Sequence, residues 1–177
     1  NFTGGEIQNT NSDTDSAIEG RGFFTVNRNG QNYYTRNGHF HADENGYLVD
    51  DAGDYVMGTN LSNNTKEPIN IGNGTVTCDA YGNLSINGTP EYKLDTVDFN
   101  DYNSLKKVGD NLFQGQNPIE NAEIYVKNKA LEESNVNVMQ EMTDMMTTMR
   151  VFESNQKVVQ NIDETVGEAV NNVGKVG

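Results

Sequence analysis

The sequence predicts an α+β protein, mainly β: an antiparallel β sandwich or barrel-like domain over residues 1–129, then one long helix within residues 130–177. Two observations predict this class. Short β-forming segments extend to about Lys129, and Asn-Gly turns stand among them as far as residue 88. From Asn137 onward the apolar residues recur every seven positions instead, which indicates a helical seam.

The β prediction rests on turn chemistry. Asn-Gly stands at 29–30, 37–38, 45–46, 73–74 and 87–88. This dipeptide suits the two positive-φ positions of a type I′ hairpin turn. Turn signals spaced by roughly eight to twelve residues favour a small antiparallel sandwich or barrel. The expected strands are 23–26, 33–36, 47–49, 55–57, 69–71, 75–78, 84–86 and 92–99.

The C-terminal segment predicts one helix over about 137–172, roughly 55 Å long at 1.5 Å per residue. A single seam helix cannot bury its own apolar stripe, so it needs a partner. That partner is another chain or, alternatively, the β domain of the same chain. The seam consists of one row, Val138, Met145, Phe152, Val159, Val166 and Val173, and a second row, Met142, Met149, Gln156, Asp163 and Val170.

Charge excludes some classes of partner. The 12 basic and 26 acidic residues give a formal net charge of −14. Such a chain repels phosphate backbones and anionic lipid, so we expect neither nucleic-acid binding nor membrane binding. The sequence has no apolar run of about 18 residues, so no membrane insertion is expected.

No catalytic constellation is visible, and we expect no enzyme, no cofactor and no metal site. Cys78 is a lone thiol without a CxxC partner. His39 and His41 could share one face of a strand, but no further ligand at a suitable spacing completes a metal site. An oxygen-rich stretch lacks the glycine position of an EF-hand loop and is interpreted as solvated turn carboxylates. It contains Asp43, Asn45, Asp50, Asp51 and Asp54.

Four blocks, in order along the chain, resemble the rod and hook proteins of the bacterial flagellar axis. They are TDSAIEGRGFF (14–24), YYTRNGHFHADENGYLV (33–49), VDFNDYNSLKKVGDNLF (97–113), and ALEESNVNVMQEM (130–142) running into MRVFESNQK (149–157). The second block is the most specific. Met149 stands where the family usually has Gln, and Phe152 where it usually has Tyr. The short middle region, 59–96, favours a rod-type member over the hook protein.

The resemblance implies a structural subunit of the flagellar rod that packs into a helical tube and transmits torque. It implies passage through the flagellar export machine and a location in the basal body, outside the cytoplasm. The implied partners are other rod and hook subunits, copies of the same chain, and an N-terminal helix of its own full-length chain, absent from this sequence. The expected assembly interface is Val138, Met142, Met145, Met149, Phe152, Val159, Ile162 and Val166.

A second function stays open: a secreted β-rich module that binds glycan or protein and carries a coiled-coil stalk. Aromatic side chains would form its stacking platform. The candidates are Tyr33, Tyr34, Tyr47 and Tyr55.

Overall fold

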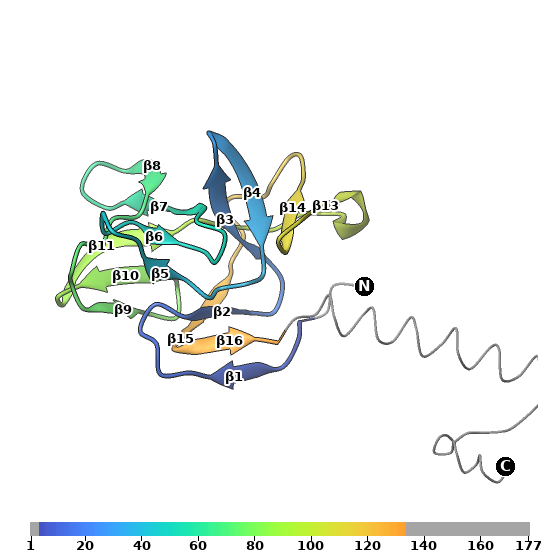
Figure 1. Ribbon diagram of the computed structural model, residues 1–177. Helices are drawn as coiled ribbons and strands as arrows, with labels where there is room; N and C mark the ends of the chain where they lie inside the picture. The colour runs from blue at the N-terminus through green and yellow to red at the C-terminus, as the bar shows by residue number, and fades with distance from the viewer. Residues whose placement is uncertain (1–3, 134–177) are drawn as a thin grey trace, which may run out of the picture. The chain divides into compact units, whose positions relative to one another are not determined.

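Sixteen β-strands and one short 3-10 helix make up the regular structure of residues 4–133, the part of the chain that the computed structural model describes (Figure 1). The first eight strands are β1 (Ile7–Asn9), β2 (Ser16–Glu19), β3 (Phe23–Arg28), β4 (Gln31–Thr35), β5 (His41–Ala42), β6 (Leu48–Val49), β7 (Tyr55–Asn60) and β8 (Thr65–Pro68). The others are β9 (Val76–Cys78), β10 (Asn83–Ile86), β11 (Thr89–Leu94), β12 (Thr96–Val97), β13 (Lys106–Gly109), β14 (Leu112–Gln114), β15 (Tyr125–Asn128) and β16 (Ala130–Glu132), with the 3-10 helix η1 (Tyr102–Ser104) between β12 and β13.

These strands form one large sheet and two small ones, and every strand pairing among the described residues is antiparallel. The large sheet runs β13-β14-β4-β3-β7-β11-β10-β9, and β5, β6, β8 and β12 pair beside that path. The small sheets are β15-β2 and β1-β16, and each joins strands from opposite ends of the described chain (Figure 1). The β unit is therefore closed by its own terminal strands.

Two of the five Asn-Gly dipeptides form the expected hairpin turns. Asn29-Gly30 connects β3 to β4 and Asn87-Gly88 connects β10 to β11, with φ positive at both residues of each turn. Gly38 instead allows a close approach. A Cβ there would lie 1.6 Å from the carbonyl oxygen of Ser16, whose amide donates to the Gly38 carbonyl at 3.0 Å.

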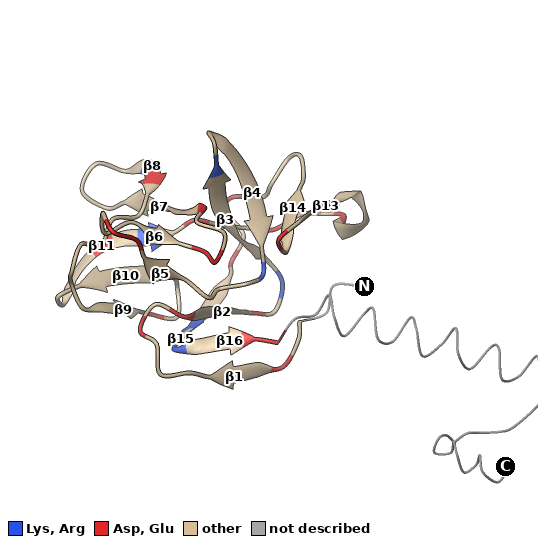
Figure 2. Ribbon diagram, viewed as in Figure 1, with Lys and Arg blue, Asp and Glu red and all other residues tan. Residues whose placement is uncertain are grey.

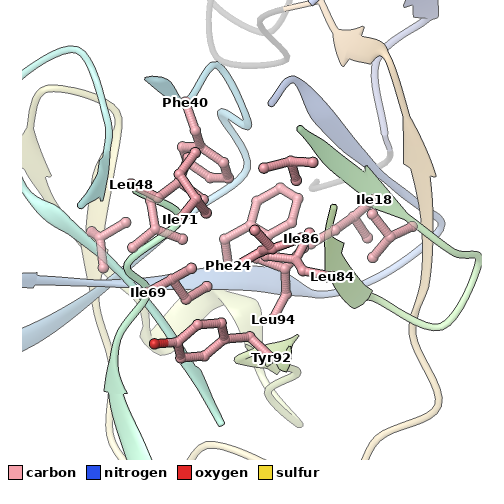
Figure 3. Close-up of a cluster of buried hydrophobic side chains, with 14 of the residues drawn as sticks. Ile18, Phe24, Phe40, Leu48, Ile69, Ile71, Leu84, Ile86, Tyr92 and Leu94 are labelled. Atoms are coloured by element: carbon pink, nitrogen blue, oxygen red, sulfur yellow. The ribbon is translucent and has the colours of Figure 1, made fainter. Parts of the chain in front are cut away.

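Strand β3 separates two apolar clusters because successive side chains point to opposite faces of a strand. Phe24 and Val26 enter the main core, in which Phe24 packs edge-on against Phe40 with ring centroids 5.2 Å apart (Figure 3). Phe23 faces a second, aromatic cluster that contains Phe99, Tyr102 and Phe113, with centroids 5.1–5.8 Å from its own ring. The β3 strand is thus buried on both faces.

The predicted fold class is wrong in one respect. Residues 4–133 are mainly β and contain no α-helix, so the α+β class with one long C-terminal helix is not supported. The seven-residue repeat that suggested the helix begins at Val138, and the predicted helix over 137–172 lies outside the described residues. Within 4–133 apolar side chains alternate along strands such as β10, where Leu84 and Ile86 are buried and Asn83 and Ser85 are half-buried, and this period of two favours strands.

Two boundaries also differ from the prediction. Residues 130–132 form β16 and pair with β1, so the β unit continues beyond Lys129. The division of the chain into domains 1–129 and 130–177 stays a prediction. Ile69 and Ile71 are buried but lie in a connection rather than a strand, because their backbone bonds go to Leu48, Val56 and Gly46 instead of a continuous ladder.

Candidate functional site: the terminal junction

The two ends of the described chain meet in a short antiparallel ribbon. We call residues 4–10 and 129–133 the terminal ribbon. Ile7 lies opposite Glu132, Gln8 opposite Leu131 and Asn9 opposite Ala130. Backbone bonds continue the pairing on either side: the Thr10 amide donates to the Lys129 carbonyl at 2.7 Å, and the Glu133 amide donates to the Glu6 carbonyl at 2.8 Å. The chain therefore enters and leaves the β unit at neighbouring points (Figure 1).

Glycine is needed where the two segments of the ribbon first touch. A Cβ on Gly5 would lie 2.3 Å from the Glu133 carbonyl oxygen, and a Cβ on Gly4 would lie 2.8 Å from Oε2 of Glu132. The Gly5 amide donates to that same Oε2 at 3.0 Å. The first residues of the ribbon are thus held against the last ones by close backbone approach.

Arg36, which directly follows β4, binds this ribbon to the rest of the β unit. Its Nε donates to Oε1 of Glu132 at 3.0 Å and one terminal nitrogen donates to Oε2. The other terminal nitrogen donates to the carbonyls of Gly20 and Gly22 at 2.8 and 2.7 Å, and the nitrogen bonded to Oε2 also donates to the Ile18 carbonyl at 3.3 Å. These bonds use all five N–H donors of the guanidinium. We call this group, Arg36 with Glu132, the hub.

The hub is shielded from water. The side chain of Glu132 is 3% exposed and that of Arg36 is 14% exposed. Burial of a charge is tolerated only when the charge is paired and its hydrogen-bonding groups are satisfied. Both conditions hold here, because the carboxylate receives bonds from Arg36 and from the Gly5 amide. Figure 2 shows that the end of β16 is acidic.

A second arginine, Arg21, contacts the aromatic cluster and an adjacent carboxylate. Arg21 donates to both carboxylate oxygens of Asp98, at 3.0 and 3.3 Å, and lies 4.3 Å from the centre of the Tyr102 ring. Burial would raise the pKa of Asp98, but hydrogen bonds from Arg21, Tyr102 and the Phe99 amide outweigh it and lower that pKa. Burial, together with the hydrogen bond to Asp98, raises the pKa of Tyr102 to about 12.

A third arginine lies at the far end of the β3–β4 hairpin. Arg28 donates to both oxygens of Asp54, at 2.8 and 2.7 Å, and to Asp110 at 3.0 Å. These hydrogen bonds outweigh desolvation and raise the pKa of Arg28. The pair connects β3 with the turns before β7 and between β13 and β14, and it has no contact with the terminal ribbon.

The oxygen-rich stretch has a structural role in turns. Oδ1 of Asp43 accepts from the amides of Asn45 and Tyr47, and Oδ1 of Asp50 accepts from the amides of Ala52 and Asp54, all at 2.9 Å. Burial raises the pKa of Asp50, although these bonds oppose the rise. Within residues 4–133 no three His, Cys, Asp or Glu side chains are grouped so that they could hold a metal ion.

The other sequence candidates do not converge on one centre. Nδ1 of His39 lies 2.8 Å from Oδ1 of Asp15, while His41 is exposed on β5. Burial and the neighbouring carboxylate of Asp79 raise the pKa of the Cys78 thiol to about 12, so the thiol is a poor nucleophile at neutral pH.

The tyrosine platform of the alternative function is not assembled. Tyr34 is buried, and its ring packs edge-on against Phe99 at 5.0 Å. Tyr47 and Tyr55 form a separate pair at 5.3 Å. Tyr33 packs against the main core. The glycan-binding interpretation is therefore not favoured.

The expected assembly residues, from Val138 to Val166, lie outside the described residues. Sequence reasoning overlooked the hub, although Arg36 and Glu132 stand inside two of the quoted blocks, YYTRNG and ALEESN. No local signal in the sequence marks this pair, because Arg36 and Glu132 lie 96 positions apart. In the part of the chain that is described, no helix is long and apolar enough to cross a membrane.

Two regions of the chain match models of known protein families. Residues 17–89 match the family model described as flagellar hook protein FlgE/F/G D1 domain, and residues 127–172 match the one described as flagellar basal body rod FlgEFG protein C-terminal. The hub thus joins the two matched regions, since Arg36 lies in the first and Glu132 in the second. Both models describe components of the flagellar axis.

Individual relatives agree. The chain is 34% identical to the flagellar basal-body rod protein FlgF of Caulobacter vibrioides, over 99% of this chain and 72% of that protein. It is 33% identical to the rod protein FlgG of Buchnera aphidicola, over 92% of this chain and 66% of that protein. A crystal structure of the Helicobacter pylori hook protein FlgE2 matches 43% of this chain and 24% of that chain, at 22% identity and a TM-score of 0.35, a likeness that carries no argument.

The chain is a structural protein of the bacterial flagellar axis. More particularly, it belongs to the family of flagellar basal-body rod proteins, and it is a rod subunit located in the flagellum outside the cytoplasm. Like the family as a whole, it assembles with other rod and hook subunits.

Proposed function

We propose that the chain works as an axial subunit in two parts. The β unit, assigned to residues 1–129 and continued by β16, forms the outer body of the subunit. Residues 130–177 make the contacts that build a helical tube and carry torque along it. The role is purely structural, without substrate or cofactor, and the subunit reaches its place through the flagellar export machine.

The observation that carries this proposal is the terminal ribbon. Because residues 4–10 and 129–133 lie side by side, a segment before the β unit and the segment after it start from one point on its surface. Such an arrangement lets both segments contribute to one inner layer while the β unit stays outside. The partners are accordingly copies of this chain, other rod subunits, and the N-terminal helix that the family resemblance implies for the full-length chain.

The contacts of the tube are assigned to the apolar residues of the C-terminal segment. They are Val138, Met142, Met145, Met149, Phe152, Val159, Ile162 and Val166. Unbranched methionine side chains adapt to slightly different neighbours, which suits heterologous contacts repeated along a filament.

The test is a charge in the middle of this apolar series. Phe152→Asp, introduced into the full-length gene, is expected to abolish rod assembly and motility, while the purified chain keeps a folded β unit. Ser154→Asp, two positions away and outside the series, is the matched control and is expected to assemble. Normal rods with Phe152→Asp would refute the assignment. Unfolding of the β unit by Phe152→Asp would show instead that this segment packs on its own β unit.

A further inference from the structure

We propose that the hub is the joint of the subunit: Arg36 is a positioning residue that fastens both strands of the terminal ribbon to the β unit through Glu132. The proposal rests on the proposed function for its meaning in the rod, because only there does the C-terminal segment carry load.

The ribbon cannot hold itself. It contains three register pairs, and two of the three residues of β1, Gln8 and Asn9, are exposed. An isolated two-stranded pair is marginally stable at best in water, and a pair this short is weaker still. Only Ala130, which is fully buried, places an apolar side chain of the ribbon in the interior. The ribbon therefore needs a polar fastening.

The hub provides that fastening on both sides. Toward the β unit, Arg36 binds the carbonyls of Ile18, Gly20 and Gly22, which lie on β2 and the bend that follows it. This bend is itself fixed, since φ is positive at Gly20 and Gly22 and the Gly22 amide donates to the Tyr102 hydroxyl at 3.0 Å. The bend is thus bonded to the β unit at a point that does not involve the ribbon.

Toward the ribbon, one carboxylate holds both strands. Glu132 belongs to β16, and its Oε2 also accepts from the Gly5 amide next to β1. Loss of Arg36 would therefore release both strands together. Lysine cannot replace arginine here, because an ammonium offers three donors on a point charge and cannot reach two carboxylate oxygens and three carbonyls in one plane.

The consequence for the rod is mechanical. A force applied beyond residue 133 enters the β unit at β16. There Glu132 and Arg36 connect it to the bend at residues 18–22, in addition to the peptide chain that continues to β15. The fork geometry of the guanidinium also fixes where Glu132, and with it the end of β16, lies against residues 18–22.

Hydrogen exchange on the purified 177-residue chain tests the joint. In Arg36→Lys, exchange of the amides of residues 7–9 and 130–133 is expected to rise roughly tenfold or more, while the amides of β3 and β7 change less than about twofold, because local opening is separable from global unfolding. Arg28→Lys is the matched control: it alters a bidentate arginine far from the ribbon and is expected to leave ribbon exchange unchanged. Glu132→Gln provides a second disruption that keeps the side-chain shape.

Two outcomes of the exchange experiment would overturn the proposal. If both Arg36→Lys and Glu132→Gln leave ribbon exchange as in the parent chain, the hub is not the fastening. If exchange rises equally in the ribbon and in β3, the hub stabilises the whole unit and is not a joint. Since exchange is measured on isolated chains, failure of the rod assignment, as tested by Phe152→Asp, would leave this result unchanged.

Discussion

The β3–β4 hairpin and the terminal ribbon are both antiparallel pairs, yet they are held in opposite ways. The hairpin has five register pairs, a two-residue Asn-Gly turn and apolar clusters on both faces of β3. The ribbon joins residues more than 120 positions apart, has three register pairs, and depends on glycine contacts and one buried ion pair. Local chemistry forms the first. Polar bonds to the rest of the β unit fix the second: those of Arg36 at its Glu132 end, and those of Asp15 to Thr10 and Lys129 at the other.

The difference implies that the two regions have separate roles: the apolar clusters determine the stability of the β unit, and the ribbon determines how its two ends are held together. We call the β unit without the terminal ribbon the body. Removing buried apolar side chains from the body should unfold the whole β unit, because each of them packs against side chains of several strands. Disturbing the ribbon should open the junction and leave the body folded, because few buried apolar groups connect them. Substitutions confined to one of the two regions test this difference.

The largest effect is expected from Gly38→Ala in the body. The added methyl would lie 1.6 Å from the Ser16 carbonyl oxygen, a backbone atom that cannot move aside without shifting β2. We expect the free energy of unfolding to fall by at least about 3 kcal/mol, measured by urea denaturation. Gly88→Ala is the control: no atom lies within 4 Å of its Cβ position, so it reports only the strain of φ +86°. Equal losses in the two variants would remove the steric explanation.

A smaller and more local effect is expected from Gly5→Ala in the ribbon. Its methyl would lie 2.3 Å from the Glu133 carbonyl oxygen. The ribbon can relieve this contact by opening, so we expect local opening to become easier by about 1–2 kcal/mol, with the global midpoint nearly unchanged. Hydrogen exchange at residues 7–9 measures the first quantity.

Cys78 reports whether the body opens together with the ribbon. Its thiol, with a pKa raised to about 12, reacts slowly with alkylating reagents while β9 is in place. In Gly5→Ala the labelling rate should match that of the parent chain. A rate that rises in step with exchange of the ribbon would mean that the two regions open as one unit.

The smallest effect concerns the Arg21 brace, the exposed counterpart of the hub. The pKa of Asp98 is lowered in the folded chain, so its ionised form stabilises the fold at pH values above its ordinary pKa of 3.8, and this contribution is lost as the pH falls through the lowered value. Asp98→Asn should cost less than about 1 kcal/mol at pH 6, because the Arg21 side chain is 59% exposed.

Urea midpoints of the parent chain and Asp98→Asn should converge between pH 4 and pH 2, where the parent loses the same contribution on protonation. Asp101→Asn is a suitable control, because that carboxylate caps η1 and has no arginine partner among the described residues. A gap that persists undiminished at pH 2 would show that the Asp98 contribution is not electrostatic.

The sequence predicted those parts of the fold that depend on neighbouring residues. The β3–β4 and β10–β11 hairpins follow from Asn29-Gly30 and Asn87-Gly88, whose conformations are local. The same dipeptide at 37–38 misled, because Gly38 serves a contact with Ser16 that only the folded chain reveals. The β13–β14 hairpin turns at Asp110-Asn111, both with positive φ, and this turn lacks the glycine of the Asn-Gly signal.

The candidate site was harder to predict for the same reason. The sequence led to the apolar series beyond residue 137, where a repeat is visible, and the family resemblance was confirmed. The pairing of Ile7–Asn9 with Ala130–Glu132 could not be predicted, because the two segments are far apart in the sequence, are not joined by a turn and show no apolar alternation. The partner of Arg36 is likewise fixed by the closure of the fold, so no local rule could select Glu132 among the 26 acidic residues.

The most direct test of the account is a cross-link across the ribbon. In a Cys78→Ser background, Gln8→Cys and Leu131→Cys place two thiols on directly opposite residues, at a separation that a disulfide can span. The account predicts rapid disulfide formation in the full 177-residue chain under mild oxidation, with the unfolding midpoint unchanged or raised. As the matched control, Gln8→Cys with Lys127→Cys should remain reduced, because Lys127 pairs with Ala17 on β2. Free thiols at 8 and 131 in a chain whose body is folded would contradict the claim that the two ends of the β unit meet.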